Sequence, residues 1–170
     1  MSNLNDINRF KAEDIAGEIG VFDSELKYPS MPNSNDMTEV LSRVTNGTYA
    51  KTATVQEMLN DLLVIEGYAV FLQDSENKQR RVINWCQDNL EYLVGQEGDS
   101  IPDYIGNYMP NRLTWIKANH ATGQHLDKQR LVSQVKLDTI AKIHFGLQRI
   151  ADAVKTCIHM RKQRYESFTE

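Results

Sequence analysis

An unbroken heptad pattern between Val55 and Leu93 constrains the fold of this chain more than any other feature of its sequence. Apolar residues recur there at alternating spacings of three and four without a change of phase, as on an α-helix that buries one stripe along its length. Ten of the twelve seam positions are apolar, and the exceptions, Glu76 and Gln79, lie in a polar stretch. We expect either one helix over residues 54–94 or a helical hairpin that turns in this stretch. The constant phase favours the single helix.

Helix-boundary signals and a second apolar stripe extend this pattern. Thr54 and Glu57 have the spacing of a capping box, and Gly95 is expected to end the helix.

A low apolar fraction of 41% favours elongated helices that share a core with other copies of the chain. We therefore predict an all-α fold with heptad packing and a homo-oligomer. Its expected seam residues are Val55, Met58, Leu62, Ile65, Leu72, Ile83, Leu90, Leu93, Ile143, Leu147, Ile150 and Val154.

The distribution of glycine, proline and charge divides the chain into four segments. Helix is expected to resume near Arg112 and to break near Gly123. The stretch 43–51 is ambiguous: it either follows the end of a short helix at Val44, or forms a small β-hairpin around Asn46-Gly47. The segments are an acidic N-terminal arm with a short helix and a strap (1–53), the long heptad helix (54–94), a loop (95–110) and a basic C-terminal helical region (111–170).

Targeting signals and cysteine usage bound the compartment. The sequence has no apolar run long enough for a membrane span and no signal-peptide pattern at its N-terminus. We expect a cytoplasmic protein, in the host cytoplasm if a phage encodes it, with no membrane partner. Cys86 and Cys157 are isolated and fall on apolar helix faces, which predicts that both are buried packing residues.

Motifs for catalysis and cofactor binding do not occur in the sequence. It contains no glycine-rich phosphate loop, no HExxH, no CxxC and no nucleophile elbow. His120 and His125 are five residues apart, an awkward spacing for two metal ligands on one helix face. We expect no enzyme activity, no cofactor and no metal site.

Positive charge is concentrated in the C-terminal third. Residues 111–164 hold eleven Lys and Arg against three Asp, in a chain whose net charge is −4. Such segregation is typical of a protein that binds a polyanion, although a solvated face, an acidic protein or the chain's own acidic arm are alternatives. Tyrosines interleaved with these charges could also stack on exposed bases, which makes Tyr104 and Tyr108 candidates. The candidate nucleic-acid-binding residues are Lys78, Arg80, Arg81, Lys128, Lys142, Arg149, Arg161, Lys162 and Arg164.

The chain resembles the UvsY-type recombination mediators of tailed phages. The resemblance rests on the segment Val21-Phe-Asp-Ser-Glu-Leu-Lys-Tyr28, on Gln79-Arg-Arg-Val82 followed by Leu90-Glu-Tyr92, and on a long C-terminal helix that ends in basic residues. Gln87 and Asn89 stand where the family has a basic pair. The resemblance implies an oligomeric assembly of helices that binds single-stranded DNA, weakens the hold of the single-strand-binding protein and helps to load a RecA-like recombinase.

Two functions are therefore weighed. The first is a non-enzymatic, single-stranded DNA-binding recombination mediator, because self-association multiplies a modest basic surface into one of high avidity. The second is a structural or scaffolding helical protein, such as a phage assembly or adaptor component, whose basic helix docks an acidic protein.

Overall fold

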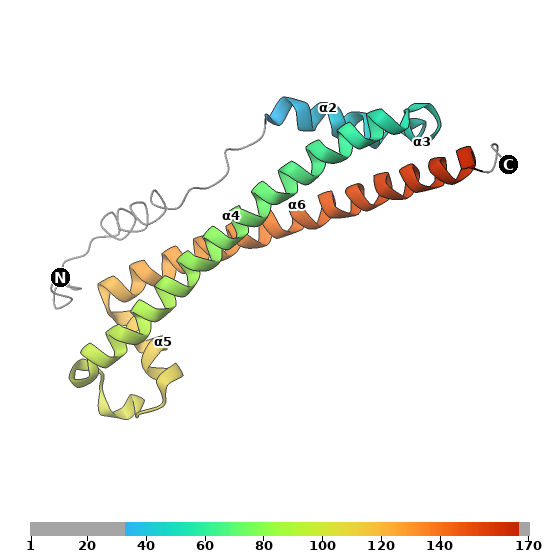
Figure 1. Cartoon of the computed structure of the whole chain (residues 1–170). Coiled ribbons are helices and arrows are strands. Elements are labelled where there is room, and N and C mark those ends of the chain that lie inside the picture. The colour runs from blue at the N-terminus through green and yellow to red at the C-terminus, as the bar shows by residue number, and fades with distance from the viewer. Residues whose placement is uncertain (1–32, 167–170) are drawn as a thin grey trace, which may run out of the picture. The chain divides into compact units, whose positions relative to one another are not determined.

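The computed structural model describes residues 33–166, and every regular element in this range is a helix (Figure 1). The predicted all-α fold is confirmed, and no strand occurs within the described range. The short helix and strap expected before residue 33 lie outside it. The elements are α2 (Ser34–Val44), α3 (Tyr49–Thr52), α4 (Val55–Gln96), the 3₁₀ turns η2 (Gly98–Ser100) and η3 (Asp103–Ile105), α5 (Met109–Asn119) and α6 (Ala121–Glu166).

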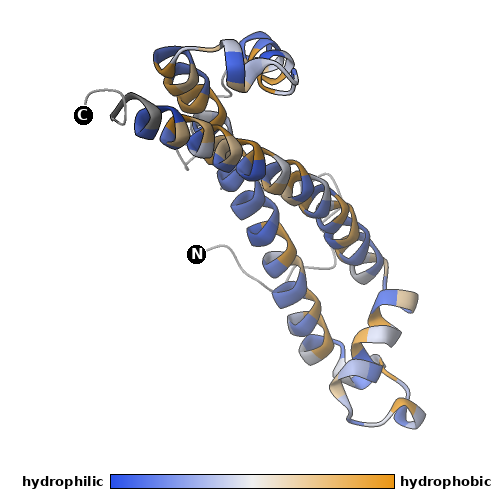
Figure 2. Ribbon diagram, turned by 90° about the vertical axis from the view of Figure 1, so that its right-hand side faces the viewer, coloured by the Kyte–Doolittle hydropathy of each residue, from blue (hydrophilic) through white to orange (hydrophobic). Residues whose placement is uncertain are grey.

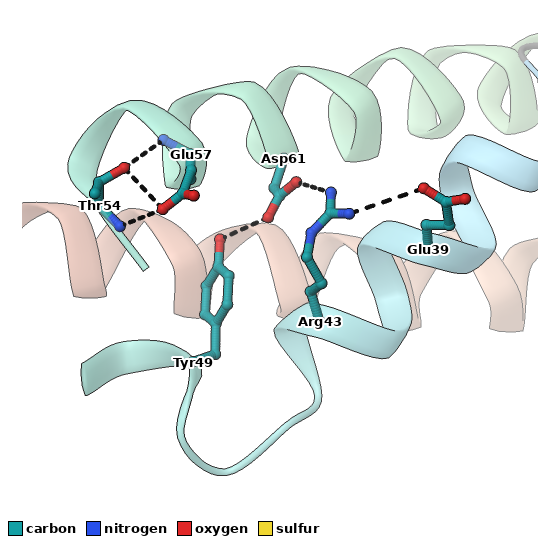
Figure 3. A network of polar contacts seen from close by, with 6 residues as sticks. All are labelled: Glu39, Arg43, Tyr49, Thr54, Glu57 and Asp61. Carbon is teal, nitrogen blue, oxygen red and sulfur yellow. Dashed lines mark hydrogen bonds and ion pairs between the residues drawn. The ribbon is translucent and has the colours of Figure 1, made fainter. Parts of the chain in front are cut away.

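Helix α4 is a single helix of 42 residues, the first of the two alternatives for this segment. Its start is the predicted capping box. The Thr54 amide donates to Glu57 Oε2 at 2.7 Å, and the Glu57 amide donates to Thr54 Oγ1 at 3.2 Å (Figure 3). These two bonds satisfy amides that have no partner inside the helix. The hydrogen bonds that Thr54 donates also lower the pKa of the Glu57 carboxyl.

The β-hairpin considered for residues 43–51 is wrong. A type I′ turn needs two residues with positive φ, but Gly106 is the only residue with positive φ in the described part of the chain. The Thr45 amide instead donates to the Leu41 carbonyl, which closes α2. The Asn46 side chain then accepts from the Thr48 amide at 3.1 Å, and the chain enters α3. Asparagine therefore turns the backbone through its side chain rather than through a left-handed conformation.

The chain divides by its contacts into two compact units. Of the described residues, 77–138 belong to unit 1, and 33–76 with 139–166 belong to unit 2. Apolar and polar residues occupy different faces of α4 and α6 (Figure 2). None of the helices within residues 33–166 combines the length and apolar character that a membrane span requires.

The core of unit 2 lies between α4 and α6, with α2 and α3 packed on it. Met58, Ile65 and Leu72 of the α4 seam are buried there. From α6 it takes Leu147, Ala151, Val154 and Ile158, and from the preceding elements Met37, Val40 and Tyr49. Met58, Ile65 and Leu72, which were expected to contact other copies, thus pack within the chain in this unit.

A buried polar pair interrupts the core of unit 2. His144 Nδ1 lies 2.7 Å from Glu76 Oε1, and both residues are buried. His144 Nε2 lies 3.1 Å from Gln148 Nε2. Glu76 is one of the two polar exceptions in the heptad. The helix does not turn there; instead, His144 of α6 lies against the Glu76 carboxylate.

Unit 1 is built from the C-terminal part of α4, the loop, α5 and the first turns of α6. Its core holds Cys86, Leu90 and Leu93 of α4 with Ile101, Ile116 and Leu126. Cys86 is fully buried, and burial raises the pKa of its thiol to about 11. The helix break lies at His120, three residues before the predicted position.

Candidate nucleic-acid interface

Lys142, Phe145 and Arg149 lie at spacings of three and four on α6 of unit 2, and so occupy one face of the helix. All three side chains are exposed, and Phe145 retains 62% of its accessible surface. The Arg149 guanidinium carbon lies 6.0 Å from the centre of the Phe145 ring, within cation–π range. We call these three residues the α6 outer face.

The apolar stripe of α6 sets the direction of this face. Leu147, Ala151 and Val154 are buried on the opposite side of the helix, so their packing turns Phe145 and Arg149 toward solvent. The seam residues Ile143 and Ile150 are less enclosed, since Ile143 is 50% exposed and Ile150 is half-buried.

The two long helices carry opposite charge in unit 2. Residues 55–76 of α4 contain five acidic and no basic residues, whereas residues 139–163 of α6 contain five basic residues and one acidic residue. Lys155 Nζ lies 2.8 Å from Glu66 Oε1, and this hydrogen bond raises the pKa of Lys155. Within residues 33–166, no ion pair involves Lys142 or Arg149. Their charges are available to a partner.

The predicted cations at the end of α6 differ in their surroundings: they are Arg161, Lys162 and Arg164. The Arg161 guanidinium donates to the carbonyls of Ala50 and Lys51 at 3.1 and 2.6 Å, which satisfies the last turn of α3. Lys162 is exposed. The side chain of Arg164 lies outside the described part of the structure. Arg161 therefore links the end of α6 to α3, and its predicted contact with nucleic acid stays a prediction.

The remaining predicted cations lie in unit 1. Lys128 and Arg80 are exposed, while Lys78 and Arg81 are half-buried. Lys78, Arg80 and Arg81 all take part in other interactions of the chain. All four belong to unit 1, whereas the α6 outer face belongs to unit 2.

The two candidate stacking tyrosines lie between α4 and α5, in the loop of unit 1. Tyr104 is 83% exposed and Tyr108 is 67% exposed. Tyr104 sits in η3, and Tyr108 precedes the first turn of α5. Both rings are accessible to a base.

Phe145 is the residue that sequence reasoning missed. The signal was its position three residues after Lys142 and four before Arg149, off the apolar stripe of α6. An aromatic between two cations on an outward face differs from a core aromatic, which falls on the buried stripe.

A second polar cluster lies around Asp61 in unit 2 (Figure 3). Asp61 is buried, accepts a hydrogen bond from Tyr49 Oη at 3.0 Å, and is paired with Arg43 of α2. Burial, together with the bond to Asp61, raises the pKa of Tyr49. An open hollow of about 490 Å³ adjoins these residues. Both carboxylate oxygens of Asp61 therefore have a hydrogen-bond partner. These bonds connect α2 and α3 to α4.

Groups of three or more His, Cys, Asp or Glu residues that could hold a metal ion do not occur among residues 33–166. In comparisons with known proteins, the chain matches no protein-family model, no curated protein and no solved structure.

Proposed function

We propose that this chain is a single-stranded DNA-binding recombination mediator, which assembles as a homo-oligomer and helps to load a RecA-like recombinase onto DNA covered by single-strand-binding protein. The observation that carries the proposal is the α6 outer face, where an exposed aromatic ring lies between two unpaired cations. Proteins that bind single strands combine these two groups, because rings stack on bases while cations neutralise phosphates.

The charge distribution supports a polyanionic ligand. Net charge over residues 139–163 is +4, from five basic residues and one acidic residue, in a chain of net −4. A local positive face attracts a nucleic-acid backbone even when the whole chain is acidic. Single strands are favoured over duplexes because Phe145 can stack only on a base that is not already paired and stacked.

The first test is fluorescence anisotropy of a labelled single-stranded oligonucleotide, with a duplex of the same sequence as competitor. We expect the full chain to bind the single strand more tightly. Phe145→Ala should weaken binding by about 1–3 kcal/mol if one base stacks on the ring. The paired change Lys142→Glu and Arg149→Glu should weaken it further by removing two phosphate contacts.

Met160→Ala is the control for loss of an exposed side chain that is not aromatic, because Met160 is 52% accessible and lies on the same side of α6, eleven residues beyond Arg149. Its affinity should equal that of the unchanged protein. Absence of single-strand binding at low salt would remove nucleic acid from the proposal. It would leave the scaffolding alternative, in which the same cations dock an acidic protein.

Mediator activity needs a second assay. A RecA-like recombinase is added to single-stranded DNA coated with single-strand-binding protein, and filament formation is followed with and without this chain. Acceleration that Phe145→Ala abolishes and Met160→Ala preserves is the expected result. DNA binding without acceleration would reduce the proposal to a single-strand binder.

A further inference from the structure

An open hollow of about 570 Å³ lies between α4 and α6 of unit 2, and it borders the α6 outer face. Gln148 and Asp152 line it from α6, and both are exposed. At about 100° per residue, these two lie about 20° to 60° from Phe145 around the helix, whereas Lys142 and Arg149 lie about 40° to 60° to its other side. Phe145 therefore separates the two cations from the hollow.

A chain of hydrogen bonds holds Gln148 from within the core. Glu76 Oε1 lies 2.7 Å from His144 Nδ1, and His144 Nε2 lies 3.1 Å from Gln148 Nε2. Glu76 and His144 are buried. A carboxylate only accepts hydrogen bonds, so Nδ1 carries the hydrogen, and the neutral ring presents Nε2 as an acceptor. The Gln148 amino group then donates to Nε2.

This arrangement decides which end of the Gln148 side chain faces the hollow. Because its nitrogen is directed to His144, its oxygen Oε1 is the group left for a ligand. Gln148 makes no other hydrogen bond within residues 33–166. The Asp152 carboxylate, on the same side of α6, forms no ion pair in that range. The side of the hollow next to Phe145 therefore offers hydrogen-bond acceptors.

His159 and Gln163 form a second pair of this kind on α6, without the carboxylate. His159 Nε2 lies 3.0 Å from Gln163 Nε2, at the same spacing of four residues. Both residues are exposed, and in the described part of the chain no hydrogen bond or ion pair joins His159 to a carboxylate. Nothing therefore fixes which ring nitrogen carries the hydrogen, and the Gln163 carboxamide can face either way. The buried Glu76 is what distinguishes Gln148.

We propose that Gln148 selects the base that stacks on Phe145, by accepting a hydrogen bond from the exocyclic amino group of that base. This selection rests on the proposed function and names its preferred substrate, a single strand rich in adenine or cytosine. These two bases present an amino group where thymine and guanine present a carbonyl oxygen. Glu76 and His144 are positioning residues, because they turn the Gln148 oxygen toward the hollow.

The charge of the hollow suits a base edge rather than a phosphate. Lys155 lines it but bonds to Glu66 at 2.8 Å, and the exposed Asp152 adds a negative charge. A phosphate is repelled by this carboxylate, whereas an amino group carries hydrogens that acceptors attract. The backbone of the strand then lies on the other side of the ring, with Lys142 and Arg149.

The test is a competition assay by fluorescence anisotropy with two oligonucleotides that differ in one chemical group. The first consists of deoxyadenosine, and in the second every adenine is replaced by purine, which lacks the 6-amino group. The full chain should bind the first roughly threefold to tenfold more tightly, as one hydrogen bond per stacked base predicts. Gln148→Met keeps the side-chain length and removes the acceptor. It should abolish the preference and leave the affinity for the purine strand unchanged.

Gln163→Met is the matched control, because it makes the same change in the pair that lacks a buried carboxylate, and the preference should be unaffected. Glu76→Gln tests the positioning role. A carboxamide at position 76 can donate to His144 Nδ1, so the ring hydrogen can move to Nε2 and Gln148 then turns its oxygen inward. The preference for adenine should be lost in a protein whose helical content circular dichroism shows to be unchanged. A purely structural role would weaken binding to both strands equally.

Equal binding of the two oligonucleotides by the unchanged chain would reject the inference and leave single-strand binding in place. A preference that survives Gln148→Met, or that Gln163→Met abolishes as well, would also overturn it. A folded Glu76→Gln variant that keeps the preference would reject the positioning role. Absence of binding to either oligonucleotide would reject the proposed function and the inference together.

Discussion

Gly123 lets the first turn of α6 approach α5 within unit 1. A Cβ at this position would lie 2.6 Å from the Ile116 carbonyl oxygen and 2.7 Å from Ile116 Cγ2. The oxygen belongs to the backbone, so relief requires a helix to move. Gly123→Ala should therefore lower the free energy of unfolding by about 1–3 kcal/mol, the usual cost of overpacking, as measured by urea denaturation.

Gly146→Ala, in the same helix, is the control for that prediction. A Cβ there meets nothing within 4 Å, so the substitution should stabilise the chain by roughly 0.5–1 kcal/mol through helix propensity. Equal effects of the two substitutions would show that the close approach to Ile116 does not limit position 123.

Glu57 makes the stability of unit 2 depend on pH. Its folded pKa lies below the ordinary value because Thr54 donates to the carboxylate. The stability that the Glu57 carboxylate contributes is therefore fully present above the pKa of the unfolded chain. It is lost as the pH falls through the pKa of the folded chain. We expect the unchanged chain to have a higher urea midpoint than Glu57→Gln at neutral pH. The difference between the two midpoints should become smaller in acid. A difference between the midpoints that does not change with pH would rule out stabilisation of the capping box by ionised Glu57.

At the scale of the element, α4 shows how far the heptad pattern reaches. Its length, its capped start and its buried face follow from the sequence, because the spacing of apolar residues fixes which side of a helix packs. The pattern does not identify the partner of that face. It predicted contacts between copies, but Met58, Ile65 and Leu72 pack against α6 of the same chain. The loops between helices decide which helix packs on the apolar face of α4, and the heptad pattern does not contain that information.

The candidate site was predictable only in part, for a related reason. Lys142 and Arg149 were found because charge is visible in composition. Phe145 was missed because the exposure of one aromatic depends on which stripe the core selects. The bonds of Arg161 to Ala50 and Lys51 span more than a hundred residues of chain, and no local pattern encodes such a contact.

The pairing of α4 with α6 in unit 2 includes the buried Glu76–His144 contact. Glu76→Leu should lower the free energy of unfolding by about 1–3 kcal/mol, because His144 Nδ1 is left without its partner in the core. His144→Leu should cost more, since it leaves a carboxylate buried. The double replacement should recover most of the loss, because two apolar side chains can then pack together.

A double-mutant cycle by chemical denaturation measures this coupling, which should fall between about 0.5 and 3 kcal/mol. The same cycle on Glu66 and Lys155, an exposed pair in the same unit, is the reference and should give under about 1 kcal/mol. Additive losses at Glu76 and His144 would mean that the two side chains do not support each other.

For the whole molecule, the proposed binding to DNA would depend on a local surplus of positive charge rather than on the net charge of −4. Each phosphate neutralised in a single strand contributes about 0.7 to the slope of log affinity against log salt. If Lys142 and Arg149 each neutralise one, the variant Lys142→Gln, Arg149→Gln should bind with a slope shallower by about 1.4 per subunit. Lys155→Gln should leave the slope unchanged, because Glu66 already neutralises Lys155. Anisotropy titrations at four salt concentrations separate these outcomes. Equal slopes for the unchanged chain and the double variant would place the phosphate contacts elsewhere. A slope that Lys155→Gln also makes shallower would mean that the salt dependence follows total charge alone.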